Sequence, residues 1–228
     1  MATFVLSDVH GHIDKYLQML DKIRFSNNDI LYVLGDILNR GIDGIKILQD
    51  MIQRENVYPI MGNHELLTLP ALDKLSWADD PIFDEEVIEK HTFMSTIGDK
   101  ATLRKFIYLP KTEKQKLIEY IKDFPLYKQI TVNNQKYLLV HAGLPDFSPG
   151  LDFSYYSAED LTFGKHDYTI KHFNDIIIIT GHIPTFNIDE GSRGKIYRKN
   201  NNIAIDCGMG SGEKLGCLCL DTNKEFYI

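Results

Sequence analysis

The stretch TFVLSDVHG (residues 3–11) is followed along the chain by ILYVLGDILNRG (30–41) and VYPIMGNHE (57–65). Each opens with an apolar or β-branched run and closes on small and polar residues, which predicts a strand that ends in a loop. Apolar residues recur at three- and four-residue spacing over 13–23 and 45–52, which is typical of amphipathic helices. This alternation of strands and helices predicts parallel strands in an α/β sheet.

The middle of the chain, residues 66–124, has a helical pattern without a clear strand. It carries an acidic run over 73–90 and a basic run over 100–122. Our main interpretation is that these are two solvated helix faces that pair with each other. The alternative is a helical cap over a cleft, with its basic side turned toward an anionic substrate. Trp77, the single tryptophan, is expected in the local core of this insertion.

After Pro125 the pattern predicts strands again. A hairpin is expected from strands at 126–132 and 136–141 around turn residues 133–135. Shorter strands are expected at 176–180, 195–198, 202–206, 215–220 and 225–227. The second half therefore predicts a mixed or antiparallel sheet. We expect residues 1–228 to form a single domain in which two packed sheets are flanked by helices.

Composition excludes several classes of protein. The 228 residues are 43% hydrophobic and 25% charged, as in an ordinary globular chain, and no apolar run approaches the roughly 18 residues that span a bilayer. The net charge of −7 argues against non-specific nucleic-acid binding and a basic membrane-binding surface. Three clustered cysteines, Cys207, Cys217 and Cys219, make a poor disulfide framework. Without a signal-peptide pattern at the N-terminus, these features predict a cytoplasmic protein.

Five groups of polar, metal-competent residues stand where predicted strands end, which is where α/β proteins place their sites. They are Asp8-x-His10-Gly11, Gly35-Asp36-x-x-Asn39-Arg40-Gly41, Gly62-Asn63-His64-Glu65, His141-Ala142-Gly143 and Gly181-His182. An isolated Asp-x-His pair is more often a helix cap beside a surface histidine. Five groups in order, each at a strand end, favour one composite site.

The residue types in these groups suit two divalent cations. The candidate ligands are Asp8, His10, Asp36, Asn63, His141 and His182. Their oxygen and nitrogen atoms suit Mn²⁺, with Fe, Zn or Mg as alternatives. The two oxygens of Asp36 can bridge the ions, and two such ions acidify a bridging water and clamp the attacked phosphoryl group. His64 is then the natural acid, and Arg40 the phosphate-binding fork.

These motifs resemble those of the calcineurin-like metallophosphoesterases, and most closely the phosphoprotein phosphatase branch with its bacterial and phage serine/threonine phosphatases. The resemblance covers about residues 2–221. It implies an α/β fold built as a four-layer α/β/β/α sandwich of two mixed sheets flanked by helices, with a dinuclear site at the strand ends. It implies a first metal on Asp8, His10 and Asp36, and a second on Asp36, Asn63, His141 and His182. His64 is expected to protonate the leaving oxygen, while Arg40 binds phosphate.

Three positions depart from the family pattern. Asn39 stands where the family usually has an Asp that holds the proton of the acid histidine, and a neutral amide cannot raise the pKa of His64 by charge. Met61 replaces an Arg that many relatives carry. Lys165 follows Phe163-Gly164 where a phosphate-binding Arg often follows Trp-Gly, so it supplies charge without a planar fork. With a weakened acid, we hypothesise that the rate of hydrolysis falls least for substrates with good leaving groups, such as aryl or tyrosyl phosphates.

The motifs predict a metal-dependent phosphatase that hydrolyses phosphomonoesters by direct attack of water. Candidate substrates are phosphoserine, phosphothreonine and phosphotyrosine in proteins, or a small phosphoester. The expected catalytic residues are His64, Arg40 and Asn39, and the expected substrate-binding residues are Arg40, Asn63, His64 and Lys165. The alternative is a symmetrical diadenosine-polyphosphate hydrolase, and a further alternative is a catalytically weak metal-binding scaffold. Neither a nucleic-acid partner nor a membrane is expected.

Overall fold

Two five-stranded mixed sheets form the centre of the protein. The computed structural model describes residues 1–77, 88, 100–148 and 150–228. Sheet A has the order β10-β9-β1-β2-β3 and sheet B the order β4-β5-β6-β8-β7. The strands of sheet A are β1 (Thr3–Leu6), β2 (Ile30–Val33), β3 (Val57–Pro59), β9 (Gly216–Cys219) and β10 (Glu225–Tyr227). Those of sheet B are β4 (Tyr127–Val132), β5 (Gln135–Val140), β6 (Ile176–Thr180), β7 (Tyr197–Lys199) and β8 (Asn202–Ala204).

Each sheet contains three neighbouring parallel strands. In sheet A, β1, β2 and β3 run parallel, as the opening sequence predicts. In sheet B, β5, β6 and β8 run parallel, with β4 and β7 antiparallel at the edges. Consequently the carboxyl ends of several strands meet at one edge of each sheet. The β4–β5 turn is formed by Asn133 and Asn134, both with positive φ, as a two-residue hairpin turn requires.

The two sheets pack face to face through apolar side chains. Val5 of sheet A and Leu34, directly after β2, meet Leu139, Ile179 and Ile203 of sheet B in one buried cluster. Because side chains alternate along a strand, the neighbours of Val5, Phe4 and Leu6, point to the other face of sheet A. Strand β1 is therefore buried over its whole length, with one face in the core between the sheets and the other in the core under the helices.

Helices cover the outer faces of this sandwich. On sheet A lie α1 (Ile13–Lys22), α2 (Gly44–Met51), α3 (Asn63–Trp77), α5 (Lys100–Ile107) and α6 (Lys111–Lys122). Sheet B is covered more thinly, by α7 (Ala158–Phe163) and its neighbouring loops. The remaining short helices are α8 (Thr185–Ile188) and 3-10 turns at Phe153–Tyr155, Glu190–Ser192 and Met209–Ser211. The predicted α/β/β/α layering of two mixed sheets flanked by helices is confirmed.

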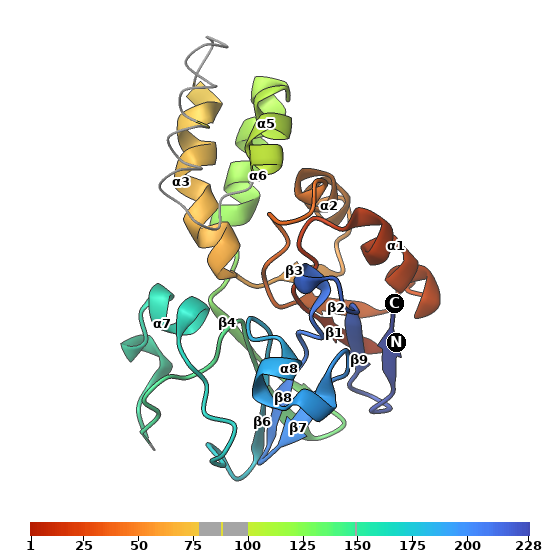
Figure 1. Ribbon diagram of the computed structural model, residues 1–228, viewed down its shortest axis with the longest axis vertical. Helices are drawn as coiled ribbons and strands as arrows, with labels where there is room; N and C mark the ends of the chain where they lie inside the picture. Colours follow the sequence, from red (N-terminus) through yellow and green to blue (C-terminus); the bar gives the residue numbers. More distant parts are fainter. Residues whose placement is uncertain (78–87, 89–99, 149) are drawn as a thin grey trace.

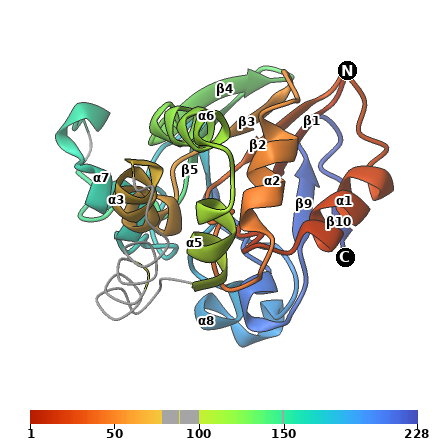
Figure 2. The ribbon, with the colours of Figure 1, turned by 90° about the horizontal axis from the view of Figure 1, so that it is seen from above.

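The helices of the insertion extend beyond the two sheets (Figure 1). In Figure 1, α3, α5 and α6 rise above the two sheets, and Figure 2 shows α1, α2, α5 and α3 following one another across the molecule. Helices α3 and α6 pack together, with an ion pair of 2.9 Å between Lys122 and Asp73. The other acidic residues of the run over 73–90 lie outside the described part of the chain. Of the expected pairing between the acidic and basic faces, the described residues therefore test only the contact between Asp73 and Lys122.

Two expectations from the sequence are wrong. Strands β9 and β10 belong to sheet A, where β9 pairs antiparallel with β1 and β10 with β9, rather than to the second sheet. Local alternation of residues does not encode which strand becomes the partner. Trp77 is 66% exposed rather than in the local core, with the Lys111 ammonium 5.7 Å from the centre of its ring.

Cys207, Cys217 and Cys219 are free thiols, and all three are buried, as expected. Within the described residues, no helix has both the length and the apolar character that crossing a membrane requires.

Candidate metal centre

Backbone hydrogen bonds join the loops that follow the central strands. The amides of Asp8 and His10 donate to the carbonyls of Gly35 and Asp36, at 3.1 and 2.8 Å, so the loops after β1 and β2 are tied together. The amide of Gly181 donates to the carbonyl of His141 at 2.8 Å, which ties the loops after β6 and β5. The two sheets thus bring four loops to one place, and the start of α3 supplies a fifth segment.

Six residues of this region adopt the left-handed backbone region that favours glycine. They are Asp8, His10, Asp36, Asn39, Arg40 and His182, with φ of 55°, 46°, 51°, 65°, 63° and 66°. Asp, Asn and His tolerate this conformation better than most residues, but each instance still costs of order 1–3 kcal/mol. Such strain persists where the surrounding structure fixes the backbone, and it turns the side chains of these loops toward one another.

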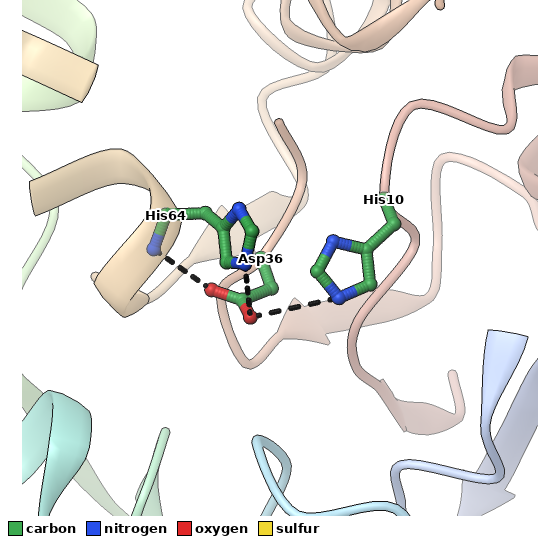
Figure 3. Close-up of side chains that lie close together, drawn as sticks. All are labelled: His10, Asp36 and His64. Carbon is green, nitrogen blue, oxygen red and sulfur yellow. Dashed lines mark hydrogen bonds and ion pairs between the residues drawn. The ribbon is translucent and has the colours of Figure 1, made fainter. Parts of the chain in front are cut away.

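The carboxylate of Asp36 lies at the centre of the cluster. Its Oδ2 is 3.6 Å from His10 Nε2 and 3.8 Å from His64 Nε2, as Figure 3 shows. Its Oδ1 is 3.3 Å from His141 Nε2 and accepts a hydrogen bond from the His64 amide at 3.1 Å. Ligand-capable atoms of His10, Asp36 and His64 lie within 4.8 Å of one another, and so do those of Asp36, His141 and His182. Asp36 is therefore shared between two groups.

Backbone carbonyls fix which histidine nitrogens carry a proton. His141 Nδ1 lies 2.6 Å from the Leu34 carbonyl, and His10 Nδ1 lies 3.4 Å from the Leu38 carbonyl. A carbonyl only accepts hydrogen bonds, so Nδ1 of each ring is the donor, and Nε2 of each neutral ring carries a lone pair. Both lone pairs face Asp36. Lone pairs and a carboxylate at this range repel one another unless a cation lies among them, which is what a metal site provides.

Asn63 extends the second group. Its side-chain amide lies 2.9 Å from His141 Nε2 and 3.0 Å from His182 Nδ1. With the amide oxygen toward the rings, four acceptor atoms converge, and the arrangement suits a cation. With the amide turned over, its nitrogen donates to the same rings and to Asp36 at 3.2 Å. Both orientations keep Asn63 in the cluster, and the first matches the expected ligand set.

Asp8 joins the first group through its carboxylate. That carboxylate accepts hydrogen bonds from Ser7 Oγ and from the His182 amide, the latter at 3.0 Å. Its Oδ1 also lies 3.9 Å from His10 Nε2. All six residues expected as ligands are thus brought together from both sheets. His64, expected as the acid, lies nearly as close to Asp36 as His10 does.

Burial shifts every ionisable group in the cluster toward its neutral form. It raises the pKa values of Asp8 and Asp36, and for Asp8 the nearby charges of Asp206 and Asp36 add to the rise. Burial, followed by the charge of Arg40, lowers the pKa of His64 to about 3, and burial with His141 lowers that of His182 to about 3. Neutral imidazoles are the metal-binding form, and a divalent cation supplies the positive charge that buried carboxylates need.

Two buried carboxylates near the cluster, Glu65 and Asp206, lie outside the expected ligand set, and from the sequence Asp206 is expected only to cap a strand near the site. Glu65 accepts hydrogen bonds from the amides of Asp36, Ile37 and Leu38 at 2.8 to 2.9 Å, and from Gly62 at 3.2 Å. Asp206 accepts from the Gly208 amide at 2.8 Å and is only 3% exposed. The sequence marks both positions, because Glu65 ends the Gly-Asn-His-Glu motif and Asp206 follows β8. It does not identify the backbone amides to which each carboxylate binds.

The expected acid, His64, lacks the support that the family pattern provides. Asn39 Nδ2 donates to Thr68 Oγ1 at 2.8 Å. Asn39 Oδ1 and His64 Nδ1 are both buried, and neither has a hydrogen-bond partner among the described residues. No charged group therefore accepts a hydrogen bond from His64 Nδ1 in this part of the chain. Asn39 is fixed by Thr68 rather than by the histidine.

The phosphate-binding candidates lie at the rim. Arg40 is exposed, and its guanidinium and the ring of His10 both lie close to Gly210. A Cβ atom added to Gly210 would lie 2.9 Å from Arg40 Nη1 and 2.3 Å from His10 Cδ2. Lys165 is exposed as well, but among the described residues no hydrogen bond or ion pair joins it to the cluster. His166, beside it, is buried and points away, with Nε2 2.9 Å from Asn202 Oδ1. Of the two expected phosphate-binding cations, Arg40 is thus the one that lies next to the cluster.

Comparison with known families agrees with this geometry. The sequence model of the calcineurin-like phosphoesterases matches residues 1–208. The chain belongs to the calcineurin-like phosphoesterase family. Enzymes of this family hydrolyse phosphoesters with divalent metals, and the clustered Asp and His side chains are groups that could hold such an ion.

Among curated calcineurin-like relatives, bis(5'-nucleosyl)-tetraphosphatase PrpE [asymmetrical] of Oceanobacillus iheyensis is 28% identical over 240 residues, covering 94% of this chain and 87% of the relative. The symmetrical bis(5'-nucleosyl)-tetraphosphatase of Wigglesworthia glossinidia brevipalpis is 26% identical over 146 residues, covering 63% and 45%. The chain spans about half the length of the symmetrical enzymes that it matches.

Solved structures share the calcineurin-like fold. A candidate diadenosine tetraphosphatase superposes with a TM-score of 0.69 at 16% identity, covering 100% of this chain and 92% of that one. A serine/threonine phosphatase from Saccharomyces cerevisiae gives 0.63 at 16% identity, covering 96% and 72%. At these identities the likeness concerns the fold alone.

We predict that Glu65→Gln destabilises the protein, because Glu65 holds the backbone amides of the Asp36 loop. The substitution places an amide NH₂ against buried N–H donors, so the free energy of unfolding of the metal-free protein should fall by about 3 kcal/mol in urea denaturation. Glu119→Gln, at an exposed position on α6, is the matched control and should change it by less than about 0.5 kcal/mol. Equal stability of the Glu65→Gln protein and the wild type would contradict the supporting role of Glu65.

Proposed function

We propose that this chain hydrolyses a phosphoanhydride bond of a dinucleoside polyphosphate. Support comes from relatives named for that activity, one of which aligns over 94% of this chain. The sequence motifs favour a phosphomonoesterase, with dinucleotide hydrolysis as the alternative. The comparisons favour that alternative over a protein phosphatase, because the sequence relatives reported above are named for it, whereas two solved protein phosphatases share the fold at 17% and 16% identity.

The proposal rests on one observation: His64, the expected acid, has no charged group that accepts a hydrogen bond from its Nδ1 among the described residues. Protonation of the leaving oxygen matters most for an alkoxide, which is a strong base, as in phosphoserine or phosphothreonine. It matters least for a nucleotide leaving group, since a phosphate has a second pKa of about 6 and departs as an anion near neutral pH. Asn39 hydrogen-bonds to Thr68 and offers His64 no charge. An anhydride is therefore the substrate whose hydrolysis is slowed least by the weak acid at this site.

We further propose the ligands of two divalent cations, Mn²⁺ being preferred. Asp8, His10 and Asp36 would hold one ion, and Asp36, Asn63, His141 and His182 the other. When bound, the ions supply activation of water and neutralisation of the phosphoryl charge. The neutral tautomers of His10 and His141 already direct their lone pairs toward Asp36.

The remaining site residues act on the substrate in this proposal. The exposed guanidinium of Arg40, beside His10, offers two parallel N–H donors to the phosphoryl oxygens. Asn63 and His64, at the first turn of α3, lie against Asp36 and orient the phosphoryl group from the helix side. His64 donates a hydrogen bond to the leaving oxygen, and Lys165 supplies a further positive charge at the rim.

The proposal predicts a substrate preference. Metal-stripped protein with Mn²⁺ added back should cleave diadenosine tetraphosphate with kcat/KM at least about tenfold above that for a phosphothreonine peptide. Asp36→Asn should lose about 100-fold or more, because both ions depend on that carboxylate, whereas Asp14→Asn on the exposed face of α1 should not. The products distinguish the symmetrical cut from the asymmetrical one. Preferred cleavage of the phosphopeptide would overturn the proposal.

Asn39→Asp should restore charge support to His64 and so change the dependence on the leaving group. Across a series of aryl and alkyl phosphates, we expect the variant to gain about tenfold on the most basic leaving groups and little on p-nitrophenyl phosphate. Asn28→Asp, at an exposed position, serves as the control. Parallel plots of log kcat/KM against leaving-group pKa for the wild type and Asn39→Asp would contradict this account.

A further inference from the structure

The rim of the metal centre carries an exposed aromatic ring that none of the steps above uses. Phe163, the last residue of α7, is 36% exposed. The centre of its ring lies 6.3 Å from that of His182, with an angle of 78° between the two planes. A phenyl ring therefore stands edge to face beside a proposed metal ligand, with a third of its surface open to solvent.

The backbone on the near side of Phe163 is tied to the metal centre. The Leu161 carbonyl accepts a hydrogen bond from the Ala142 amide at 2.9 Å, directly after His141. The start of α7 is fixed by a capping box in which the side chains of Ser157 and Asp160 each accept from the other's backbone amide. Helix α7 is thus capped at its start and joined to the loop after β5 at its last turn.

The far side of Phe163 is held just as firmly. A Cβ on Gly164 would lie 2.2 Å from the Asp160 carbonyl and 2.6 Å from Pro145 Cγ, so the chain turns where only glycine fits. Two residues later His166 is buried, and it uses both of its ring nitrogens. Its Nδ1 accepts from the Leu144 amide at 3.3 Å, and its Nε2 bonds to Asn202 Oδ1 at 2.9 Å.

An aromatic side chain on a backbone fixed in this way loses little conformational freedom when a ligand stacks on it. Aromatic rings stack on nucleobases in proteins that bind single-stranded nucleic acids, without preference for one base. The metal centre and Arg40 contact only phosphoryl groups in the proposed reaction. A dinucleotide differs from a bare polyphosphate in its nucleosides, so a separate element must contact them.

We propose that Phe163 binds a nucleobase of the substrate by stacking, and that it distinguishes a nucleoside polyphosphate from an inorganic one. This inference rests on the proposed function. The base lies on the exposed part of the ring, on the His182 side of the centre, while the phosphoryl group to be attacked lies over Asp36 and toward Arg40.

The test compares two anhydrides, one with nucleosides and one without. In Phe163→Leu, KM for diadenosine tetraphosphate should rise about tenfold with kcat little changed, whereas KM for inorganic tripolyphosphate should stay the same. Phe163→Trp should keep or lower KM for the dinucleotide, because its ring is larger. Tyr155→Leu removes an aromatic ring that is 76% exposed in the 3-10 turn before α7, and it should leave both KM values unchanged.

The outcomes separate this inference from the proposed function. Equal rises in KM for both anhydrides in Phe163→Leu would show a structural role and overturn the stacking proposal, as would no rise in either. In both cases wild-type hydrolysis of the dinucleotide still supports the proposed function. A wild type that cleaves p-nitrophenyl phosphate but neither anhydride would overturn the proposed function, and the inference that rests on it.

Discussion

The rest of the structure depends on one electrostatic constraint, the convergence of acceptor atoms on the carboxylate of Asp36. Nitrogens of three buried imidazoles lie within 3.3 to 3.8 Å of its two oxygens. Two of those rings donate their other nitrogen's proton to a backbone carbonyl, so they turn lone pairs toward the carboxylate. Such an arrangement is unfavourable by itself and becomes favourable around cations. Hydrogen bonds to the backbone hold the groups of this cluster in place.

The fold provides that rigidity. The amides of the Asp36 loop are held by the buried carboxylate of Glu65, and the loop is tied to the Asp8–His10 segment through backbone hydrogen bonds. The second sheet contributes His141 and His182, and the amide of His182 donates to Asp8 across the sandwich. Left-handed backbone at six positions costs stability, and the packed sandwich core offsets that cost. The strained backbone conformations are thus found in the loops that carry the candidate metal ligands.

Much of this was predictable from the sequence because motif and strand end coincide. The runs before Asp8, Asp36 and Asn63 have the pattern of strands, and parallel order brought their ends together. The pairing of β9 with β1 was not predictable, since a strand's partner is chosen by long-range packing. The role of Glu65 was not predictable, although Glu65 belongs to a motif, because a motif does not say which backbone amides a carboxylate binds. The isolation of Asn39 from His64 and the rigid setting of Phe163 likewise depend on distances.

Counting and characterising bound Mn²⁺ tests the central claim most directly. Metal-free protein would be titrated with Mn²⁺ and followed by calorimetry and electron paramagnetic resonance. Because one carboxylate serves both groups, the account predicts two ions per chain whose spins are coupled, so that the signal of isolated Mn²⁺ is lost on saturation. A single ion per chain, or two ions that give independent signals, would contradict the claim that Asp36 joins them.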